Sequence, residues 1–408
     1  MTERSNDLNA VVIVVKIGIF FCVLRACQKR YQVNGSFKQT GTPDKQFMTL
    51  TMDKFLNDME KEKPIRFTDQ QLRIATDNYS YHLGSGGFGS VYKGSFSNGT
   101  IIAVKVLRGS SDKIIDAQFM AEVGTIGKVH HFNLVRLYGF CFERHLRALV
   151  YEYMVNGPLE KYLFHESTIL SFEKLHEIAI GTARGIAYLH EECQQRIIHY
   201  DIKPGNILLD MNFCPKVADF GLAKICNRDH THITMTGGGG GTPGYAAPEL
   251  WLPFPVTHKC DVYSFGMLLF EIIGRRKNHN INHPESQVWF PMWAWEKFAA
   301  EKVGELITSC GIDDKDREIA ETIVKVALSC VQDKPEARPI MSVVVKMLEG
   351  SVEVPNPPNP FQYLIGWVPP THGTDTDISS DSSALVTKSV PVLATHAITT
   401  DEIQLASV

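Results

Sequence analysis

One short run of the chain has the residue types and spacing that phosphate chemistry needs. The run reads HYDIKPGN, with Asp201, Lys203 and Asn206, and Asp219 follows it within the run DFG. A positioned carboxylate can accept a hydroxyl proton, while carboxylate and amide oxygens suit a hard cation such as Mg²⁺. The spacing predicts Asp201 as a general base with Lys203 beside it, and Asn206 and Asp219 as metal ligands.

A glycine-rich run lies upstream, where LGSGGFGSVYKG has its glycines in G-x-G-x-x-G spacing. In a dinucleotide-binding fold such glycines open a helix, but here a strand pattern follows, so the loop joins two strands and can cover a phosphate chain. A simple glycine hairpin is the alternative for this loop considered alone. The sequence has no P-loop run of the G-x-x-x-x-G-K-[ST] type, which counts against a P-loop nucleotide site. The residues predicted to cover the phosphates are Leu83, Gly84, Ser85, Gly86, Gly87, Phe88 and Gly89.

A lysine ends the apolar strand pattern IIAVK, and Glu122 follows Lys105 by seventeen residues in a helical stretch. A lone strand lysine is usually a solvated charge, but a lysine held by a carboxylate can bind the α- and β-phosphates of a nucleotide. The run APE then ends at Glu249, thirty residues after Asp219. These parts occur in the order of the protein kinase signatures, and chance agreement across so many spacings is negligible. We therefore predict an ATP-dependent protein kinase that uses Mg²⁺, with Mn²⁺ as the alternative metal.

The elements that position these residues divide into two groups. Residues 78–154 alternate short β-rich runs with glycine-rich turns, interrupted by one helical stretch at 116–129. Residues 155–350 have helical periodicity instead. Strands followed by helices predict an α+β fold with a β-rich N-lobe and a helical C-lobe, which together form the domain 67–350. The expected C-lobe helices are 172–193, 262–273, 293–307, 317–330 and 340–348.

Composition sets limits on the remaining functions. The 408 residues are 44% hydrophobic and 21% charged, which excludes wholesale disorder. A formal net charge of −4 provides no basic footprint, so we expect no nucleic-acid partner. The nine cysteines are scattered without a C-x-x-C pair, which predicts neither a zinc site nor a disulfide framework.

The two ends differ from the middle. Segment 8–26 is predicted as a single transmembrane helix, because Leu8–Leu24 is apolar apart from Asn9 and Lys16. Four basic residues follow Leu24, namely Arg25, Lys29, Arg30 and Lys38, which predicts a cytoplasmic location for the rest of the chain. A buried strand or helix is the alternative, and a removable signal peptide is disfavoured because no basic n-region or cleavage pattern is present. Residues 27–66 are expected to be a juxtamembrane linker, and 351–408 a disordered tail.

The domain 67–350 resembles the plant receptor-like serine/threonine kinases, the class related to Pelle and the interleukin-receptor-associated kinases. The stretches HHFNLVRLYGFC, GIAYLHEEC and KVADFGLAK resemble most closely the leaf-rust-resistance-type receptor kinases. The resemblance implies protein substrates, a plasma-membrane location, and a co-receptor or homo-oligomer as partner. It also implies that Tyr151 is the gatekeeper, that Glu152 and Met154 present hinge groups to adenine, and that Val91, Ala103 and Leu208 enclose the adenine ring.

Two departures from the family pattern bear on regulation. Tyr200 stands where most kinases have an arginine, so the chain resembles the non-RD kinases. An arginine there reads a phosphorylated activation loop, and a tyrosine cannot. Five glycines, Gly237–Gly241, precede Thr242, and we expect a loose activation segment because glycine loses most entropy on ordering. The competing function is a kinase-like scaffold that signals by binding; a tyrosine kinase is a more distant alternative.

Overall fold

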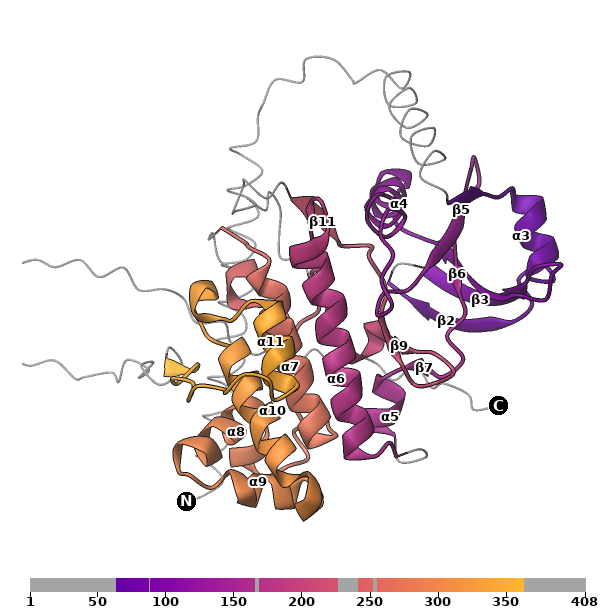
Figure 1. The fold of residues 1–408 in the computed structure, drawn as a ribbon. Coiled ribbons are helices and arrows are strands. Elements are labelled where there is room, and N and C mark those ends of the chain that lie inside the picture. The colour runs from indigo at the N-terminus through magenta and orange to yellow at the C-terminus, as the bar shows by residue number, and fades with distance from the viewer. Residues whose placement is uncertain (1–63, 88, 166–168, 227–240, 252–254, 363–408) are drawn as a thin grey trace, which may run out of the picture. The chain divides into compact units, whose positions relative to one another are not determined.

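A β-rich lobe precedes a helical lobe in the computed structural model, which describes residues 64–87, 89–165, 169–226, 241–251 and 255–362 (Figure 1). This arrangement confirms the predicted α+β, bilobal class. Within these ranges, no helix is long and apolar enough to cross a membrane. The anchor predicted at 8–26 lies outside them.

The N-lobe is built on a six-stranded sheet in the order β1-β5-β6-β4-β3-β2, antiparallel except for the β1–β5 pair. Alternation along β4 places Ile102 and Val104 on the outer face of this sheet, against Leu72 and Val150. Ala103 and Lys105, which alternate with these two residues, therefore point to the opposite, inner face. The elements are β1 (Ile65–Arg66), α3 (Asp69–Ala75), β2 (His82–Gly86), β3 (Gly89–Ser95), β4 (Ile101–Leu107), α4 (Asp112–Ile126), β5 (Leu137–Glu143) and β6 (Leu146–Glu152).

The N-lobe begins earlier than the sequence predicted. Strand β1 pairs with β5 through Ile65 and Gly139, although residue 65 was expected in the linker, and α3 adds a helix before residue 78. Thr68 caps α3 in a reciprocal capping box with Gln71, and Leu72 is fully buried in the sheet's outer cluster. A two-residue strand with exposed side chains has no alternation that a sequence pattern could reveal.

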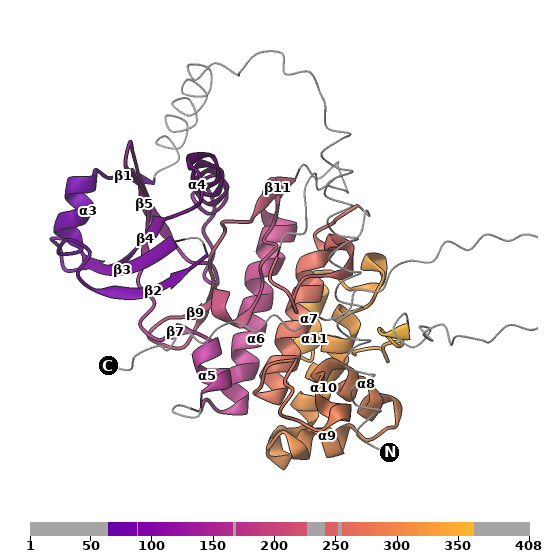
Figure 2. The ribbon, with the colours of Figure 1, turned by 180° about the vertical axis from the view of Figure 1, so that it is seen from behind.

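The C-lobe packs α6, α7, α10 and α11 together, with α5 and the short strands β7 and β9 toward the sheet (Figures 1 and 2). Helix α7 is buried along nearly its whole length. Gly266 permits its close contact with α10, because a Cβ there would lie 2.8 Å from the Cβ of Cys330. The bounds are β7 (Gly157–Pro158), α5 (Glu160–Phe164), α6 (Phe172–Ala187), β8 (Arg196–Ile198), β9 (Ile207–Leu209), β10 (Pro215–Val217), β11 (Lys224–Cys226), α7 (Lys259–Gly274), α8 (Phe290–Ala299), α9 (Val303–Ser309), α10 (Arg317–Cys330) and α11 (Met341–Leu348).

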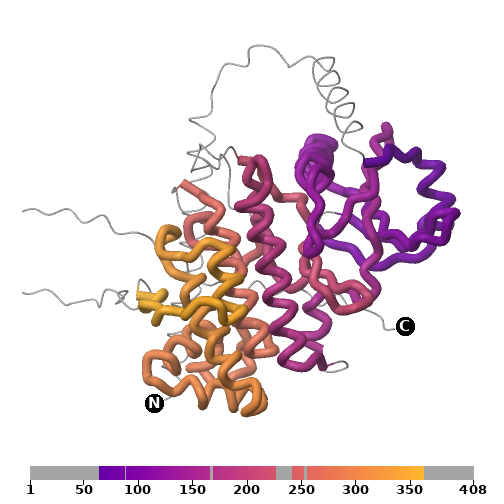
Figure 3. The backbone as a smooth tube through the Cα atoms, viewed as in Figure 1, coloured from indigo at the N-terminus to yellow at the C-terminus, as the bar shows by residue number. Residues whose placement is uncertain are grey.

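Two predicted helices are divided in the structure, while α4 and α7 begin three or four residues earlier than predicted. The stretch 293–307 forms two helices, α8 and α9, because the chain turns at Glu301 with a left-handed φ of 57°. The stretch 172–193 ends as an α-helix at Ala187 and continues as a π-helical turn over Tyr188–Glu192. The backbone tube in Figure 3 shows α8 and α9 as separate helices at the end of the C-lobe.

The predicted disordered tail begins too early at residue 351. Phe361 is fully buried, with its ring centroid 4.8 Å from that of Trp289, and the Gln332 side chain donates a hydrogen bond to the carbonyl oxygen of Pro358. Residues 351–362 therefore belong to the C-lobe. The prolines of this segment restrict the unfolded chain, which lowers the entropic cost of docking a single aromatic anchor.

Candidate active site

A cavity of about 540 Å³ lies where the N-lobe sheet faces the C-lobe strands. Strands β3, β4 and β6 provide its upper wall, and β9 and the segment before Asp219 provide its lower wall. The predicted residues that line it are Leu83, Gly84, Ser85, Val91, Ala103, Lys105, Glu122, Tyr151, Glu152, Met154, Asn206, Leu208 and Asp219.

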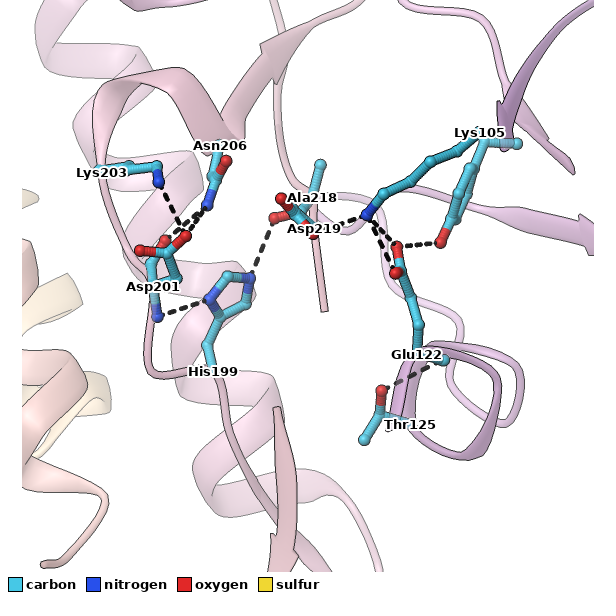
Figure 4. Close-up of polar contacts among 10 residues, drawn as sticks. Lys105, Glu122, Thr125, His199, Asp201, Lys203, Asn206, Ala218 and Asp219 are labelled. Carbon is cyan, nitrogen blue, oxygen red and sulfur yellow. Dashed lines mark hydrogen bonds and ion pairs between the residues drawn. The ribbon is translucent and has the colours of Figure 1, made fainter. Parts of the chain in front are cut away.

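Lys105 joins the two lobes at the inner end of the cavity (Figure 4). Its Nζ lies 3.0 Å from Glu122 Oε2 on α4 and 2.7 Å from Asp219 Oδ1. Burial would lower the pKa of Lys105, but the two carboxylates outweigh it and raise that pKa. Burial likewise opposes ionisation of Asp219 by raising its pKa. The charge and the hydrogen bond of the Lys105 ammonium are the largest opposing effects, and the pKa of Asp219 stays below its usual value. Lys105 and Asp219 are therefore both charged at neutral pH, as binding of phosphates and metal requires.

Tyr151 adds a third group to this contact. Its hydroxyl donates a short hydrogen bond to Glu122 Oε1, and the side chain is buried on β6 beside Ala103 of β4. Burial and the Glu122 carboxylate raise the pKa of Tyr151, so the phenol stays neutral and donates. The resemblance placed Tyr151 next to adenine, but it contained no sign of this hydrogen bond, which restrains Glu122 from the sheet side.

A second network surrounds Asp201. Asn206 Nδ2 donates to Asp201 Oδ2 at 2.9 Å, and Lys203 Nζ lies 2.9 Å from the same oxygen (Figure 4). Thr242 Oγ1 donates to Asp201 Oδ1 at 2.5 Å and accepts from Lys203 Nζ at 2.7 Å. Asp201 and Lys203 lie beside the cavity lining, to which Asn206 connects them. The sequence had not predicted Thr242 as a member of this network.

Asp261, on α7, holds the backbone of the loop 199–206, which contains Asp201 and Asn206 and is called the catalytic loop. Its two carboxylate oxygens accept the N–H groups of His199 and Tyr200, each at 2.8 Å, and His190 Nε2 lies 2.8 Å from Oδ2. These bonds fix Tyr200 in a left-handed backbone conformation, with φ at 66°. Sequence analysis missed Asp261, although an acid directly before the apolar stretch that begins at Val262 is a signal that a buried charge has a partner.

The glycine loop is the turn between β2 and β3. Gly89 has a φ of +138°, and a Cβ there would lie 2.1 Å from the carbonyl oxygen of Val106, so only glycine fits. Gly86 ends β2, and Gly87 follows it in the turn. Neither Gly86 nor Gly89 lines the cavity as Gly84 does. Phe88 lies outside the described residues.

The two departures from the family pattern, Tyr200 and the glycine run 237–241, lie next to each other in the structure at Gly241, which packs against the Tyr200 backbone. The Tyr200 side chain is 2% exposed, and its hydroxyl has no hydrogen-bond partner within the described ranges. Lys224 Nζ lies 5.8 Å from the ring centroid. Gly241 has a φ of +103°, and a Cβ there would lie 3.0 Å from the Tyr200 carbonyl oxygen, so the last glycine of the run is required locally. Gly237–Gly240 lie outside the described residues.

The donor set suits a divalent cation with oxygen ligands. Asn206 Nδ2 is used by Asp201, which turns its amide oxygen away from that carboxylate, and Asn206 and Asp219 line the same cavity. An amide oxygen and an ionised carboxylate, supplemented by phosphate oxygens, match the preferences of Mg²⁺. Both residues therefore fit a nucleotide-bound metal.

A buried carboxylate outside the cavity, Glu271, predicts a measurable pH dependence of stability. Glu271 on α7 accepts from the Tyr245 hydroxyl at 2.7 Å and from the N–H of Asn278, yet burial raises its pKa to about 7. Between pH 4.5 and 7 the folded chain thus binds more protons than the unfolded chain, so the free energy of unfolding falls as pH rises. In the Glu271→Gln variant, the free energy of unfolding should fall by about 2–3 kcal/mol less between about pH 5 and 8 than in the unchanged chain, measured by urea unfolding. Replacing the exposed Glu305 with Gln is the control, and an equal change in both variants would contradict the assignment.

Comparison with known proteins gives the site its context. The family model for protein tyrosine and serine/threonine kinases matches residues 78–348. The chain is 46% identical over 311 residues to a G-type lectin S-receptor-like serine/threonine-protein kinase of Arabidopsis thaliana, covering 74% of this chain and 35% of that relative. It is 43% identical over 321 residues to Rust resistance kinase Lr10 of Triticum aestivum, covering 76% and 50%. The chain therefore spans half or less of the length of these relatives. The resemblance to receptor-like serine/threonine kinases that the sequence indicated is confirmed.

Proposed function

The chain belongs to the protein tyrosine and serine/threonine kinase family, and we propose that it transfers the γ-phosphoryl group of ATP to serine and threonine hydroxyls of proteins. One observation carries this proposal: Lys105 bridges Glu122 and Asp219 across the lobes, in the same cavity that Asn206 lines. Phosphoryl transfer needs positioning and charge stabilisation rather than covalent chemistry, and this arrangement supplies both.

Each residue has a role in this proposal. Lys105 binds the phosphates, and Glu122 holds Lys105 in place. Asn206 and Asp219 hold Mg²⁺, which neutralises charge on the phosphates when bound. Asp201 accepts the proton of the substrate hydroxyl. Its Oδ1 already accepts a hydrogen bond from the Thr242 hydroxyl, so this oxygen is oriented to receive a hydroxyl donor.

The adenine end has matching roles. Val91 and Ala103 lie above the proposed adenine position and Leu208 below it, since all three line the cavity from opposite lobes. The hinge residues Glu152 and Met154 follow the gatekeeper Tyr151 along the same wall. Backbone groups at this point can pair with the adenine edge while the apolar side chains exclude water.

A scaffold without activity has little support here. Such a protein would normally have lost Lys105, Asp201 or Asp219, and this chain retains all three in connected geometry. The deciding experiment is phosphate transfer from labelled ATP by the full chain to serine, threonine and tyrosine peptides, beside an Asp219→Ala control. Transfer to tyrosine alone, or equal transfer by the control, would overturn the proposal.

We propose membrane anchoring through residues 8–26, with the kinase domain in the cytoplasm, at the plasma membrane and acting with a co-receptor or a second copy. The support is the apolar run Val11–Leu24 and the asymmetry of its basic flanks. The full chain should remain in the membrane pellet after carbonate extraction, whereas a chain that starts at Tyr31 should be soluble. Recovery of the full chain in the supernatant would contradict the anchor.

The non-RD pattern predicts weak control by loop phosphorylation. With Tyr200 in the place of an arginine, phosphate at Thr231, Thr234 or Thr236 has no guanidinium in the catalytic loop with which to pair. Changing these three threonines to alanine should alter the turnover number only modestly, measured with a peptide substrate and dephosphorylated enzyme. A loss of about a hundredfold, roughly 2.7 kcal/mol, would mean that the loop phosphate does switch the enzyme.

A further inference from the structure

A second cavity, of about 620 Å³, adjoins the nucleotide cavity. The two share Val135 and Glu152, so one wall of the second cavity is the segment that carries the hinge. We call it the rear cavity. Its lining residues are Val129, His130, His131, Phe132, Leu134, Val135, Arg136, Glu152 and Lys216.

The rim of the rear cavity is cationic. Arg136 is exposed, and within the part of the chain that the structure describes no carboxylate lies within 4 Å of its guanidinium. Glu152 is the single acid of the lining, and it is already engaged by the N–H of Arg136 at 2.8 Å and by Lys216 Nζ at 3.7 Å. The exposed Lys128 lies one residue before the lining begins. The rim therefore favours an anionic partner.

The floor of the rear cavity is apolar. Phe132 is 65% exposed, and Lys216 holds it by donating to its carbonyl oxygen at 2.8 Å, with Nζ 5.0 Å from the ring centroid. Val129 and Leu134 line the cavity beside it. An apolar floor under a cationic rim fits a peptide in which acids flank one aliphatic side chain.

The chain contains such a peptide beyond the described residues. Segment 371–383 reads THGTDTDISSDSS, with Asp375, Asp377 and Asp381 around Ile378 and no lysine or arginine. Phe361 is anchored on the C-lobe, and an extended chain spans about 3.3–3.6 Å per residue. The fourteen residues from Phe361 to Asp375 can thus reach roughly 45–50 Å. We propose that segment 371–383 docks in the rear cavity of its own chain, with Ile378 over Phe132 and the aspartates at the cationic rim.

Tethering makes this docking favourable even if the contacts are weak. A segment joined to the domain has an effective concentration on the order of millimolar. An intrinsic Kd of about 0.1 mM then predicts about tenfold slower exchange of amide hydrogens that docking covers. Because Val135 and Glu152 line both cavities, the docked segment would contact the outer side of the hinge.

The test compares hydrogen exchange of the loop 130–136 in three forms of the full chain. The first is unchanged, the second has Asp375, Asp377 and Asp381 changed to lysine, and the control has Asp401 and Glu402 changed to lysine. We expect about tenfold faster exchange in the second form alone. Equal exchange in all three, or the same acceleration in the control, would overturn the proposal.

A photo-crosslinker tests the contact between Ile378 and Phe132 directly. Benzoylphenylalanine in place of Ile378 should react with the peptide that contains Phe132, and the same group in place of Ile398 should not. Arg136→Glu should abolish the crosslink while leaving the melting temperature unchanged, because the Arg136 side chain is exposed. Crosslinks between isotopically distinct chains, with a yield that rises with concentration, would overturn docking within one chain in favour of a second copy.

Discussion

Replacing Lys105 with methionine is expected to lower phosphate transfer at least about a thousandfold, equivalent to roughly 4 kcal/mol of transition-state stabilisation. Methionine has a similar length but no charge, so it cannot bridge Glu122 and Asp219, which Lys105 Nζ contacts at 3.0 and 2.7 Å. The remaining carboxylates then face each other in a buried site, which weakens binding of both the phosphates and the metal. The measurement is autophosphorylation and peptide phosphorylation with labelled ATP.

The matched control is Lys113→Met, which changes the same residue type at an exposed position of α4. It should retain full activity. Circular dichroism and thermal melting of Lys105→Met should show that the fold is present, so that loss of transfer reports on the site. Equal turnover by Lys105→Met and the unchanged chain would remove Lys105 from the mechanism.

The largest stability effect is expected at Arg338, where methionine should cost about 3–5 kcal/mol. Arg338 is 1% exposed, and its guanidinium pairs with both oxygens of Glu249, one of them at 2.9 Å. It also donates to the carbonyl oxygens of Gln332, Lys259 and Asp333. Removing it leaves a buried carboxylate without its counter-charge, which is the costly way to break such a pair. Urea unfolding measures the difference.

Two further variants separate pairing from simple loss of an arginine. Arg317→Met removes an arginine that makes an exposed contact with Glu321 and should change stability by less than about 0.5 kcal/mol. The double variant of Arg338→Met with Glu249→Gln should be more stable than Arg338→Met alone, because no unpaired charge remains. A loss below about 1 kcal/mol for Arg338→Met would show that this pair does not hold the end of the activation segment.

The residues proposed for catalysis stand out in the sequence because their chemistry restricts both residue type and spacing. Asp201 and Asn206 lie five residues apart in one loop, and the loop backbone fixes their separation. Their side chains can therefore form a hydrogen bond whatever the rest of the fold does. The alternation along β4 similarly predicts that Ala103 and Lys105 share a face. The strand-then-helix order predicted two lobes for the same reason, since each periodicity is local to its own segment.

Other parts of the site depend on contacts between distant residues. Asp261 lies 61 residues from Tyr200, and its role as an anchor of the catalytic loop follows only from the packing of α7 under that loop. Thr242 reaches Asp201 across 41 residues. The docking of Phe361 on Trp289 corrected the predicted tail, because composition describes average burial and one aromatic side chain can outweigh it.

Residue types and short spacings were enough to predict the reaction class and the two-lobe order, because both features are local in the chain. The residues expected around adenine came instead from the resemblance to the receptor-like kinases. That Lys105 also contacts Asp219, across 114 residues, became clear only in the folded molecule. No local pattern specifies such pairs, since burial strengthens a charge interaction only after the fold has excluded water from both partners. The rear cavity belongs to the same class of feature, because its cationic rim forms where a loop after α4 meets Lys216 of β10.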